Sequence, residues 1–232
     1  MDEVLINIGN THTVFAATNG QLLNRVPTSE GLAVAKELSF SRAWCVSVVS
    51  EASQLLQKEF GGRVNFLKAT DCSEIDFSEV DVSTVGADRL ANILAANSLY
   101  PDSAVLILDC GTCITAELLL NGAFKGGFIQ PGRMIQRKSL TDYTSALPKT
   151  ELSELIPVLV GQDTNAAIKS GIDWIAAKGL VAAVRELEGI YEELKIIITG
   201  GDAAFFSQEL IDAEVISDLT LKGLAVYSAS FS

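Results

Sequence analysis

The chain has 232 residues, of which 48% are hydrophobic and 20% charged, and its formal net charge is −12. This length can bury a substantial core, as one large domain or two small ones. So acidic a surface repels a phosphate backbone, which argues against nucleic acid as a partner. No apolar run reaches the roughly 20 residues that span a bilayer. The acidic start Met1-Asp2-Glu3 lacks the basic region of a signal peptide. We therefore expect a cytoplasmic protein with no membrane partner.

The four cysteines are too few for a disulfide scaffold of this size, so we expect reduced thiols. Cys110 and Cys113 form a C-x-x-C motif, which leaves a redox function as an alternative. Residues 114–120 read as a strand, however, whereas a thioredoxin-type motif needs a helix at this place.

The first hundred residues alternate between strand and helix patterns. Apolar β-prone segments at 4–8, 13–18, 22–26 and 43–49 predict strands, and the spacing of apolar residues predicts helices over 31–38 and 86–97. Gly9-Asn10-Thr11 is a turn, and Asn19-Gly20 is a strong signal for a two-residue hairpin. Pro101 then breaks the chain, at the only plausible seam.

The second part opens like the first. A strand over 104–108 ends at Asp109, Cys110-Gly111-Thr112 forms a turn, and a strand over 114–120 leads to the hairpin signal Asn121-Gly122. The later patterns predict a long helix over 165–188, interrupted near Gly179, and another strand over 195–198. A helix over 203–210, a short strand over 214–216 and a final helix over 221–229 complete the chain.

The two openings share one register. Gly111 follows Gly9 by 102 positions, and Asn121 and Gly122 follow Asn19 and Gly20 by the same 102. Two copies of strand, Gly-Thr turn, strand, Asn-Gly hairpin and strand indicate an ancient duplication. We therefore predict an α/β fold of two similar halves, residues 1–102 and 103–232.

Each Gly-Thr turn suits a phosphate. Glycine lets the backbone approach phosphate oxygens closely, and the N–H groups and hydroxyls of the turn can donate to them. A carboxylate at the strand end can hold the water shell of a magnesium ion or act as a base. The alternative is that Gly9 and Gly111 are ordinary turn glycines.

The residues resemble the type III pantothenate kinase family in eight segments, which occur in the family's order and cover nearly the whole chain. These are Asn7-Ile8-Gly9-Asn10-Thr11, Val85-Gly86-Ala87-Asp88-Arg89, Asp109-Cys110-Gly111-Thr112, Gly126-Gly127-Phe128-Ile129-Gln130-Pro131-Gly132, Thr144-Ser145-Ala146-Leu147-Pro148, 164–171, Thr199-Gly200-Gly201 and Leu219-Thr220-Leu221-Lys222-Gly223-Leu224.

The resemblance implies an actin-like ATPase fold, in which two ribonuclease-H-like halves with mixed sheets bind ATP. It implies phosphorylation of pantothenate to 4′-phosphopantothenate, the first step of coenzyme A biosynthesis. It further implies Mg²⁺, a monovalent cation (K⁺ or NH₄⁺), and a homodimer that shares the substrate site across its interface.

The resemblance also implies roles for individual residues. Asp109 matches the catalytic aspartate that accepts the proton of the attacking hydroxyl. Thr164 matches a threonine that reaches the substrate across the dimer. The pantothenate-binding segment corresponds to Gly86, Asp88 and Arg89, and the ATP and phosphate turns to Asn7, Gly9, Asn10, Thr11, Gly111, Thr112, Gly200 and Gly201.

A guanidinium at Arg89 suits the carboxylate of the substrate, and Asp88 can accept from its hydroxyl or amide groups. A solvated helix residue is the alternative at Arg89, and an ordinary strand-end carboxylate is the alternative at Asp109.

Two departures from the family bear on activity. Asn7 stands where the family usually has aspartate, and an amide holds metal-bound water less firmly than a carboxylate does. Asn121 stands where many members carry an acidic residue near the monovalent cation, which puts that site in doubt.

Three functions therefore stay open: an active kinase, a degenerate paralogue that binds nucleotide or pantothenate as a regulatory protein, and another phosphotransferase or phosphohydrolase on the same fold. Asn7 favours the second, and the segment from Gly86 to Arg89 argues against the third.

Overall fold

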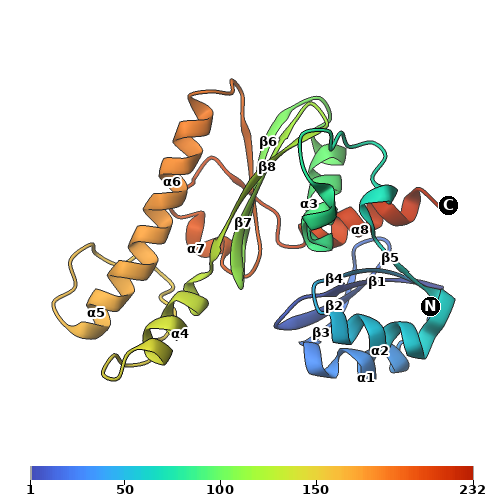
Figure 1. Ribbon diagram of the computed structural model, residues 1–232, viewed down its shortest axis with the longest axis horizontal. Helices are drawn as coiled ribbons and strands as arrows, with labels where there is room; N and C mark the ends of the chain where they lie inside the picture. Colours follow the sequence, from blue (N-terminus) through green and yellow to red (C-terminus); the bar gives the residue numbers. More distant parts are fainter. Residues whose placement is uncertain (1, 232) are drawn as a thin grey trace. The chain divides into compact units, whose positions relative to one another are not determined.

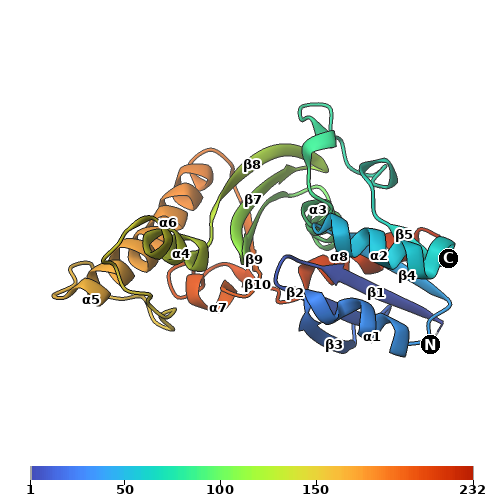
Figure 2. The same ribbon diagram turned by 60° about the horizontal axis from the view of Figure 1, so that its bottom comes forward.

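The computed structural model describes residues 2–231, which contain two five-stranded sheets (Figures 1 and 2). The first sheet has the strand order β3-β2-β1-β4-β5. Its strands are β1 (Glu3–Ile8), β2 (His12–Ala17), β3 (Leu22–Pro27), β4 (Arg42–Ser47) and β5 (Val64–Phe66). β1 runs antiparallel to β2 and parallel to β4, so the sheet is mixed.

The second sheet has the order β10-β9-β6-β7-β8. Its strands are β6 (Ala104–Cys110), β7 (Cys113–Leu120), β8 (Ala123–Pro131), β9 (Lys195–Thr199) and β10 (Glu214–Val215). β6 pairs in parallel with β9, and β9 with β10. Both β1 and β6 are therefore central strands, flanked on one side by the next two strands of the chain and on the other by two later strands.

This shared order confirms the predicted α/β fold of two mixed sheets. β1 and β6 are central because their sequences are almost continuously apolar, as strands covered on both faces require.

The two Asn-Gly hairpins differ in detail. Asn121 and Gly122 both have positive φ (49° and 78°), as the predicted two-residue turn requires. At the first hairpin only Gly20 has positive φ, and the Ala17 N–H donates to the carbonyl of Gln21. The first loop is therefore one residue longer than the predicted two-residue turn.

Four helices belong with the first sheet: α1 (Gly31–Glu37), α2 (Ser50–Phe60), α3 (Ala87–Leu99) and α8 (Leu219–Ala229). α3 and α8 pack closely, since a Cβ on Gly223 would lie 1.8 Å from the carbonyl oxygen of Ala91. The buried Thr220 hydroxyl donates to Oδ1 of Asn92 at 2.9 Å, which satisfies polar groups inside this contact. Glycine is required here because backbone meets backbone.

The helices of the second unit are α4 (Arg133–Tyr143), α5 (Thr164–Lys169), α6 (Ile175–Glu188) and α7 (Ala203–Phe206). The predicted helix over 165–188 is interrupted, but at a π-helical turn, Ser170–Trp174, rather than near Gly179. The helix predicted over 203–210 ends at Phe206, after which the chain continues in turns. α2, β5 and α4 were not predicted.

The chain forms two compact units. The first comprises Met1–Ser103, Leu119–Gly126 and Asp218–Ser232, and the second comprises Ala104–Leu118 and Gly127–Ser217. The hairpin tip and α8, which the predicted boundary assigned to the half 103–232, thus group with the first unit. The two halves 1–102 and 103–232 remain a prediction about ancestry. Over residues 2–231, no helix has the length and apolar character that crossing a membrane requires.

Candidate nucleotide and substrate sites

The turn after β1 is fixed by several hydrogen bonds, one of which runs from the Thr28 N–H to the Thr11 carbonyl at 3.1 Å. The Gly9 N–H donates to the carbonyl of His12 at 2.9 Å, and the Thr28 hydroxyl donates to the Gly9 carbonyl at 2.6 Å. Asn10 and Thr11 are exposed at the tip of this turn. Gly9, Asn10 and Thr11 are therefore together, as predicted, on a rigid turn that presents polar groups to solvent.

Asn7 lies in β1, opposite Val14 on one neighbouring strand and Val46 on the other. Its side chain is half-buried, two residues before Gly9. The residue at this place is neutral, so the first turn has no carboxylate at its strand end.

A pocket of about 450 Å³ lies beside the first turn, within the first unit. Its wall is mostly apolar, and Asn10, Thr28 and Glu51 are among its polar members. Of the predicted site residues only Asn10 is among those that line it, and neither Asp88 nor Asp109 does.

The turn after β6 is contacted by two segments distant in the sequence, at Gly132 and at Gly200. Asp109 is half-buried and pairs in register with Thr199 of β9. The Gly111 N–H donates to the carbonyl of Cys113 at 2.9 Å, and the Thr112 carbonyl accepts from the Gly132 N–H at 3.0 Å. Thr112 is exposed at the tip.

Gly200 fits against Asp109 with no room for a side chain. Its φ is +89°, and a Cβ there would lie 2.5 Å from Oδ1 of Asp109 and 2.5 Å from the carbonyl oxygen of Cys110. Nothing lies within 4 Å of a Cβ on Gly201. The second unit therefore brings together five of the predicted site residues, namely Asp109, Gly111, Thr112, Gly200 and Gly201, where the parallel strands β6 and β9 end.

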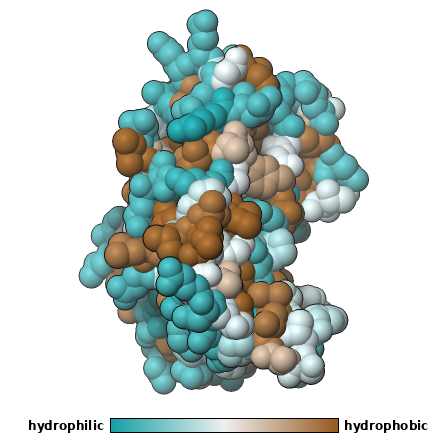
Figure 3. All heavy atoms as spheres, turned by 90° about the vertical axis from the view of Figure 1, so that its left-hand side faces the viewer, coloured by the Kyte–Doolittle hydropathy of each residue, from teal (hydrophilic) through white to brown (hydrophobic). Residues whose placement is uncertain are grey.

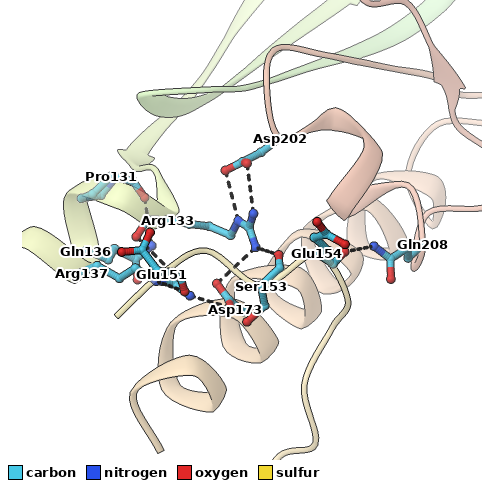
Figure 4. A network of polar contacts seen from close by, with 10 residues as sticks. All are labelled: Pro131, Arg133, Gln136, Arg137, Glu151, Ser153, Glu154, Asp173, Asp202 and Gln208. Carbon is cyan, nitrogen blue, oxygen red and sulfur yellow. Dashed lines mark hydrogen bonds and ion pairs between the residues drawn. The ribbon is translucent and has the colours of Figure 1, made fainter. Parts of the chain in front are cut away.

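A buried ion network lies behind this turn, and sequence reasoning missed it (Figure 4). Arg133 donates to both carboxylate oxygens of Asp202, at 3.1 and 3.0 Å. Arg133 also donates to Asp173 at 3.3 Å, and Arg137 donates to the other oxygen of Asp173 at 2.6 Å. Two arginines spaced i, i+4 on a helix that follows Pro131-Gly132 were the available signal.

The buried environment of Cys110 argues against a redox role for the C-x-x-C motif. Burial raises the pKa of the Cys110 thiol far above its usual range, and the carboxylate of Asp109 raises it further. A reactive thiol needs a lowered pKa and access to solvent. Cys113 is exposed, and β7 begins there, as the strand pattern predicted.

The predicted pantothenate segment opens α3. Gly86 is the residue before the helix, and the Asp88 carboxylate accepts from the Arg89 N–H at 2.8 Å. Burial raises the pKa of Asp88, while the backbone hydrogen bond and the charge of Arg89 oppose that rise. The Arg89 guanidinium carbon lies 5.9 Å from the ring centroid of Phe124. Gly86, Asp88 and Arg89 thus form one cluster within the first unit.

The last two predicted residues, Thr164 and Asn121, lie on other elements than the two clusters described above. Thr164 is the first residue of α5 and is exposed, next to Asp163, whose carboxylate caps the helix. Asn121 is exposed at the tip of the β7–β8 hairpin. Within residues 2–231 no three His, Cys, Asp or Glu side chains gather as a metal site. Asp109 could thus hold Mg²⁺ only with phosphate and water as further ligands, which is how Mg²⁺ is usually bound.

Large apolar side chains are exposed around α4, α5 and the segment that joins them. The most exposed are Tyr143 (90%), Val158 (76%), Val160 (75%) and Leu155 (73%). Figure 3, which views the molecule from the side of α5 and α6, shows apolar side chains gathered on this face. Exposed apolar side chains gathered on one face are typical of surfaces that bind a partner.

The chain is similar in sequence to type III pantothenate kinases. The sequence profile of type III pantothenate kinases matches residues 3–187. A type III pantothenate kinase from Kosmotoga olearia is 31% identical, over 97% of this chain and 95% of its own length.

Two solved structures show the fold alone. A conserved protein of the Baf family from Campylobacter jejuni has a TM-score of 0.69 and 20% identity, with 98% of both chains covered. An inorganic polyphosphate/ATP-glucomannokinase from Arthrobacter has a TM-score of 0.51 and 14% identity, with 100% of both chains covered. The fold is that of the actin-like ATPases and sugar kinases, as predicted.

Proposed function

The chain belongs to the type III pantothenate kinase family, and we propose on this basis that it transfers the γ-phosphoryl group of ATP to the terminal hydroxyl of pantothenate. The product would be 4′-phosphopantothenate, in the first step of coenzyme A biosynthesis. One observation carries the proposal for this chain: Gly200 leaves the Asp109 carboxylate undisturbed at the end of β6, beside a turn that can receive phosphate.

In this proposal the second turn receives the phosphates. The exposed Thr112 hydroxyl and backbone N–H groups of the turn would donate to phosphate oxygens, except the Gly111 N–H, which donates to the Cys113 carbonyl. Mg²⁺ neutralises phosphate charge when it is bound, and Asp109 would hold it through water. A monovalent cation at Asn121 remains a prediction, and no step depends on it.

Two carboxylates compete for the role of proton acceptor. Asp109 is the predicted base. Asp88 is a second candidate, because burial raises its pKa and a base works best when its pKa lies nearer the working pH. Asp88 belongs to the first unit and Asp109 to the second. Substitution of each aspartate by asparagine in a separate variant distinguishes the two roles.

Arg89 is proposed to bind the carboxylate of pantothenate. Its guanidinium lies over the Phe124 ring, which shields one face from water and would strengthen a charge-assisted hydrogen bond. Asp88 lies beside it and can accept from the hydroxyl or amide of the same molecule.

A homodimer is proposed from the exposed apolar face. Leu155, Val158 and Val160 lie within ten residues of Thr164 in the chain. If this face binds a second copy, Thr164 is carried to the interface, which supports its predicted contact with substrate across the dimer. A cytoplasmic location also remains a prediction.

The other open function is a binding protein without turnover. Asn7 favours it, because an outer-shell amide in place of a carboxylate typically costs about 10–100-fold in metal affinity or activity. The retained Asp109, Gly200 and Arg89 support the active enzyme instead.

The test uses two acceptors. Purified protein with ATP, Mg²⁺ and ammonium should phosphorylate pantothenate, and it should use pantothenyl alcohol poorly because that acceptor lacks the carboxylate. Arg89→Ala should raise the pantothenate KM far more than the ATP KM, by roughly 10–100-fold if a charge-assisted bond worth about 1.5–3 kcal/mol is lost. It should also abolish the preference between the two acceptors.

Nucleotide binding without product would favour the binding protein. Equal effects of Arg89→Ala on both KM values would remove Arg89 from the substrate site.

A further inference from the structure

We propose that Arg133 is a positioning residue for the nucleotide: it fixes the Gly200–Asp202 turn through Asp202, an assignment that rests on the proposed function. The inference concerns a network within the second unit (Figure 4). No predicted site residue belongs to that network, yet Asp202 directly follows Gly200 and Gly201, and Gly132, which precedes Arg133, contacts Gly111 and Thr112.

Asp202 is held through both its backbone and its side chain. Its backbone N–H donates to the carbonyl of Cys110 at 2.8 Å, directly after Asp109. Its side chain accepts two parallel hydrogen bonds from Arg133. A bidentate contact fixes orientation as well as position, because the guanidinium and carboxylate planes must align. Asp202 is therefore constrained at both ends, and Gly200 and Gly201 immediately precede it.

Arg133 is itself fixed by burial and by its other contacts. It is 3% exposed, and its guanidinium carbon lies 3.6 Å from the ring centroid of Phe205. Its remaining N–H groups reach the Ser153 carbonyl at 2.9 Å and Asp173 at 3.3 Å. Asp173 is fully buried in the π-helical turn, a feature often found at functional sites. Arg133 therefore has one orientation.

Arg133 is the first residue of α4, next to the turn after β6. It follows Gly132, whose N–H donates to the Thr112 carbonyl at 3.0 Å. A Cβ on Gly132 would lie 2.2 Å from the carbonyl oxygen of Gly111, so the backbones touch. One side chain therefore joins the turn at 109–112, the start of α4 and the Gly200–Asp202 turn.

Charge explains why arginine is needed. The network contains two arginines and two aspartates, which balance, and a buried charge without its partner is strongly unfavourable. Lysine at 133 would keep the charge but offers a single point of donation, so it cannot hold Asp202 bidentately while also reaching Asp173. Arg133→Lys should release the turn without removing charge.

Arg137 is the matched control. It is equally buried and donates to the same Asp173, but none of its hydrogen bonds reaches Asp202. Arg137→Lys disturbs the network in the same way except at the Gly200–Asp202 turn. A purely structural network would make the two variants equivalent.

The experiment titrates a non-hydrolysable ATP analogue with Mg²⁺ into wild type, Arg133→Lys and Arg137→Lys by calorimetry. Arg133→Lys should weaken binding on the order of tenfold, as expected for a lost hydrogen bond between charged groups, and Arg137→Lys by less than about twofold. Equal weakening by both variants, or none by Arg133→Lys, would overturn the proposal. If Arg133→Lys does not fold, Asp202→Asn should give the same tenfold loss, and normal binding by Asp202→Asn would overturn it.

Hydrogen exchange separates this inference from the proposed function. The backbone amides of residues 200–206 should exchange faster in Arg133→Lys than in Arg137→Lys, with or without nucleotide. Should wild type bind no nucleotide, the proposed function fails, and unchanged exchange at 200–206 would still refute the positioning role.

Discussion

The turns after β1 and β6 come from the same kind of strand in two sheets of the same order, but they differ in what holds them. The first is tied by hydrogen bonds that join Gly9 to His12 and Thr28, and two residues before Gly9 it has the neutral Asn7. The second carries Asp109 and is packed against Gly132, Gly200 and Asp202. A repeated framework can therefore be kept while one copy takes the charge and the constraints.

This difference indicates which of the two turns is the better candidate for the reaction site. Catalysis by positioned groups requires that their surroundings do not move, so the more constrained turn is the better candidate for the reacting phosphate. The first turn can bind phosphate through its backbone and still contribute little to proton transfer. The predictions that follow try to break this asymmetry.

The largest expected effect is that of Asp109→Asn. If Asp109 accepts the proton, kcat should fall by about 10²–10⁴-fold, because an amide cannot take a proton from the hydroxyl. Stability should change little, since the amide keeps the shape of the side chain. Steady-state kinetics with thermal unfolding as the control measures both, and a kcat within about twofold of wild type would end the catalytic role of Asp109.

Asp88→Asn is the companion variant, with a pH signature. Burial raises the pKa of Asp88, so its contribution to stability is present below the ordinary aspartate value and is lost as pH rises through the raised value. Asp88→Asn should therefore gain stability relative to wild type as pH rises across that window. If Asp88 is the base, wild-type kcat/KM should fall on the acid side at a pH above the usual aspartate range, and Asp88→Asn should lose more activity than Asp109→Asn.

Gly200→Ala against Gly201→Ala tests the constraint on the second turn. An alanine at 200 needs a positive φ and meets Oδ1 of Asp109 at 2.5 Å, whereas one at 201 meets nothing within 4 Å. Gly200→Ala should lower the free energy of unfolding by about 1–3 kcal/mol and reduce kcat, as strained backbone and a displaced carboxylate require. Gly201→Ala should stay within about 0.5 kcal/mol of wild type. Denaturant unfolding decides, and similar losses for both glycines would mean that the turn is not packed against Asp109.

Asn7→Asp tests the missing charge of the first turn. A carboxylate there should raise kcat or lower the Mg²⁺ requirement by up to about tenfold, because it adds attraction for the ion's water shell. The gain should vanish at low Mg²⁺, where the new charge repels the γ-phosphate. Kinetics over a Mg²⁺ titration checks this. An inactive protein that stays inactive at saturating Mg²⁺ and ammonium would make the binding-protein function the better account.

The smallest expected effect compares Gly9→Ala with Gly111→Ala. A Cβ at Gly9 would lie 3.2 Å from the carbonyl oxygen of His12, which is tight, whereas one at Gly111 has its nearest atom at 3.8 Å. Gly9→Ala should destabilise by about 1 kcal/mol, and Gly111→Ala should be neutral in stability. Melting temperatures in the absence of nucleotide measure the difference, and the reverse order would show that the close contact between Gly9 and the His12 carbonyl does not limit the side chain at position 9.

Local sequence patterns predicted most strands because their signals are local. Apolar runs in β1 and β6 and the Asn-Gly hairpins predicted both openings, and the 102-residue register predicted two similar halves, whose sheets share one strand order. The long helix was predicted, but its break at the π-helical turn was not, because Asp173 is placed there by buried partners that lie 36 and 40 residues away. α4 was missed because its two buried arginines break the apolar pattern of an amphipathic helix.

The candidate site follows the same rule. Gly200 could be singled out by resemblance, but its contact with Asp109 depends on the parallel pairing of β6 with β9 and cannot be read from either segment. The raised pKa of Asp88 likewise comes from burial, which its own residue type does not predict. Long-range contacts, rather than residue types, decide both.

The most direct test is ³¹P NMR of purified wild-type protein with ATP, Mg²⁺, ammonium and pantothenate. The account predicts that the γ-phosphate signal of ATP declines while ADP and a phosphomonoester signal of 4′-phosphopantothenate rise in equal amounts, and that Asp109→Asn shows none of this. Intact ATP, or ADP accompanied only by inorganic phosphate, would contradict it.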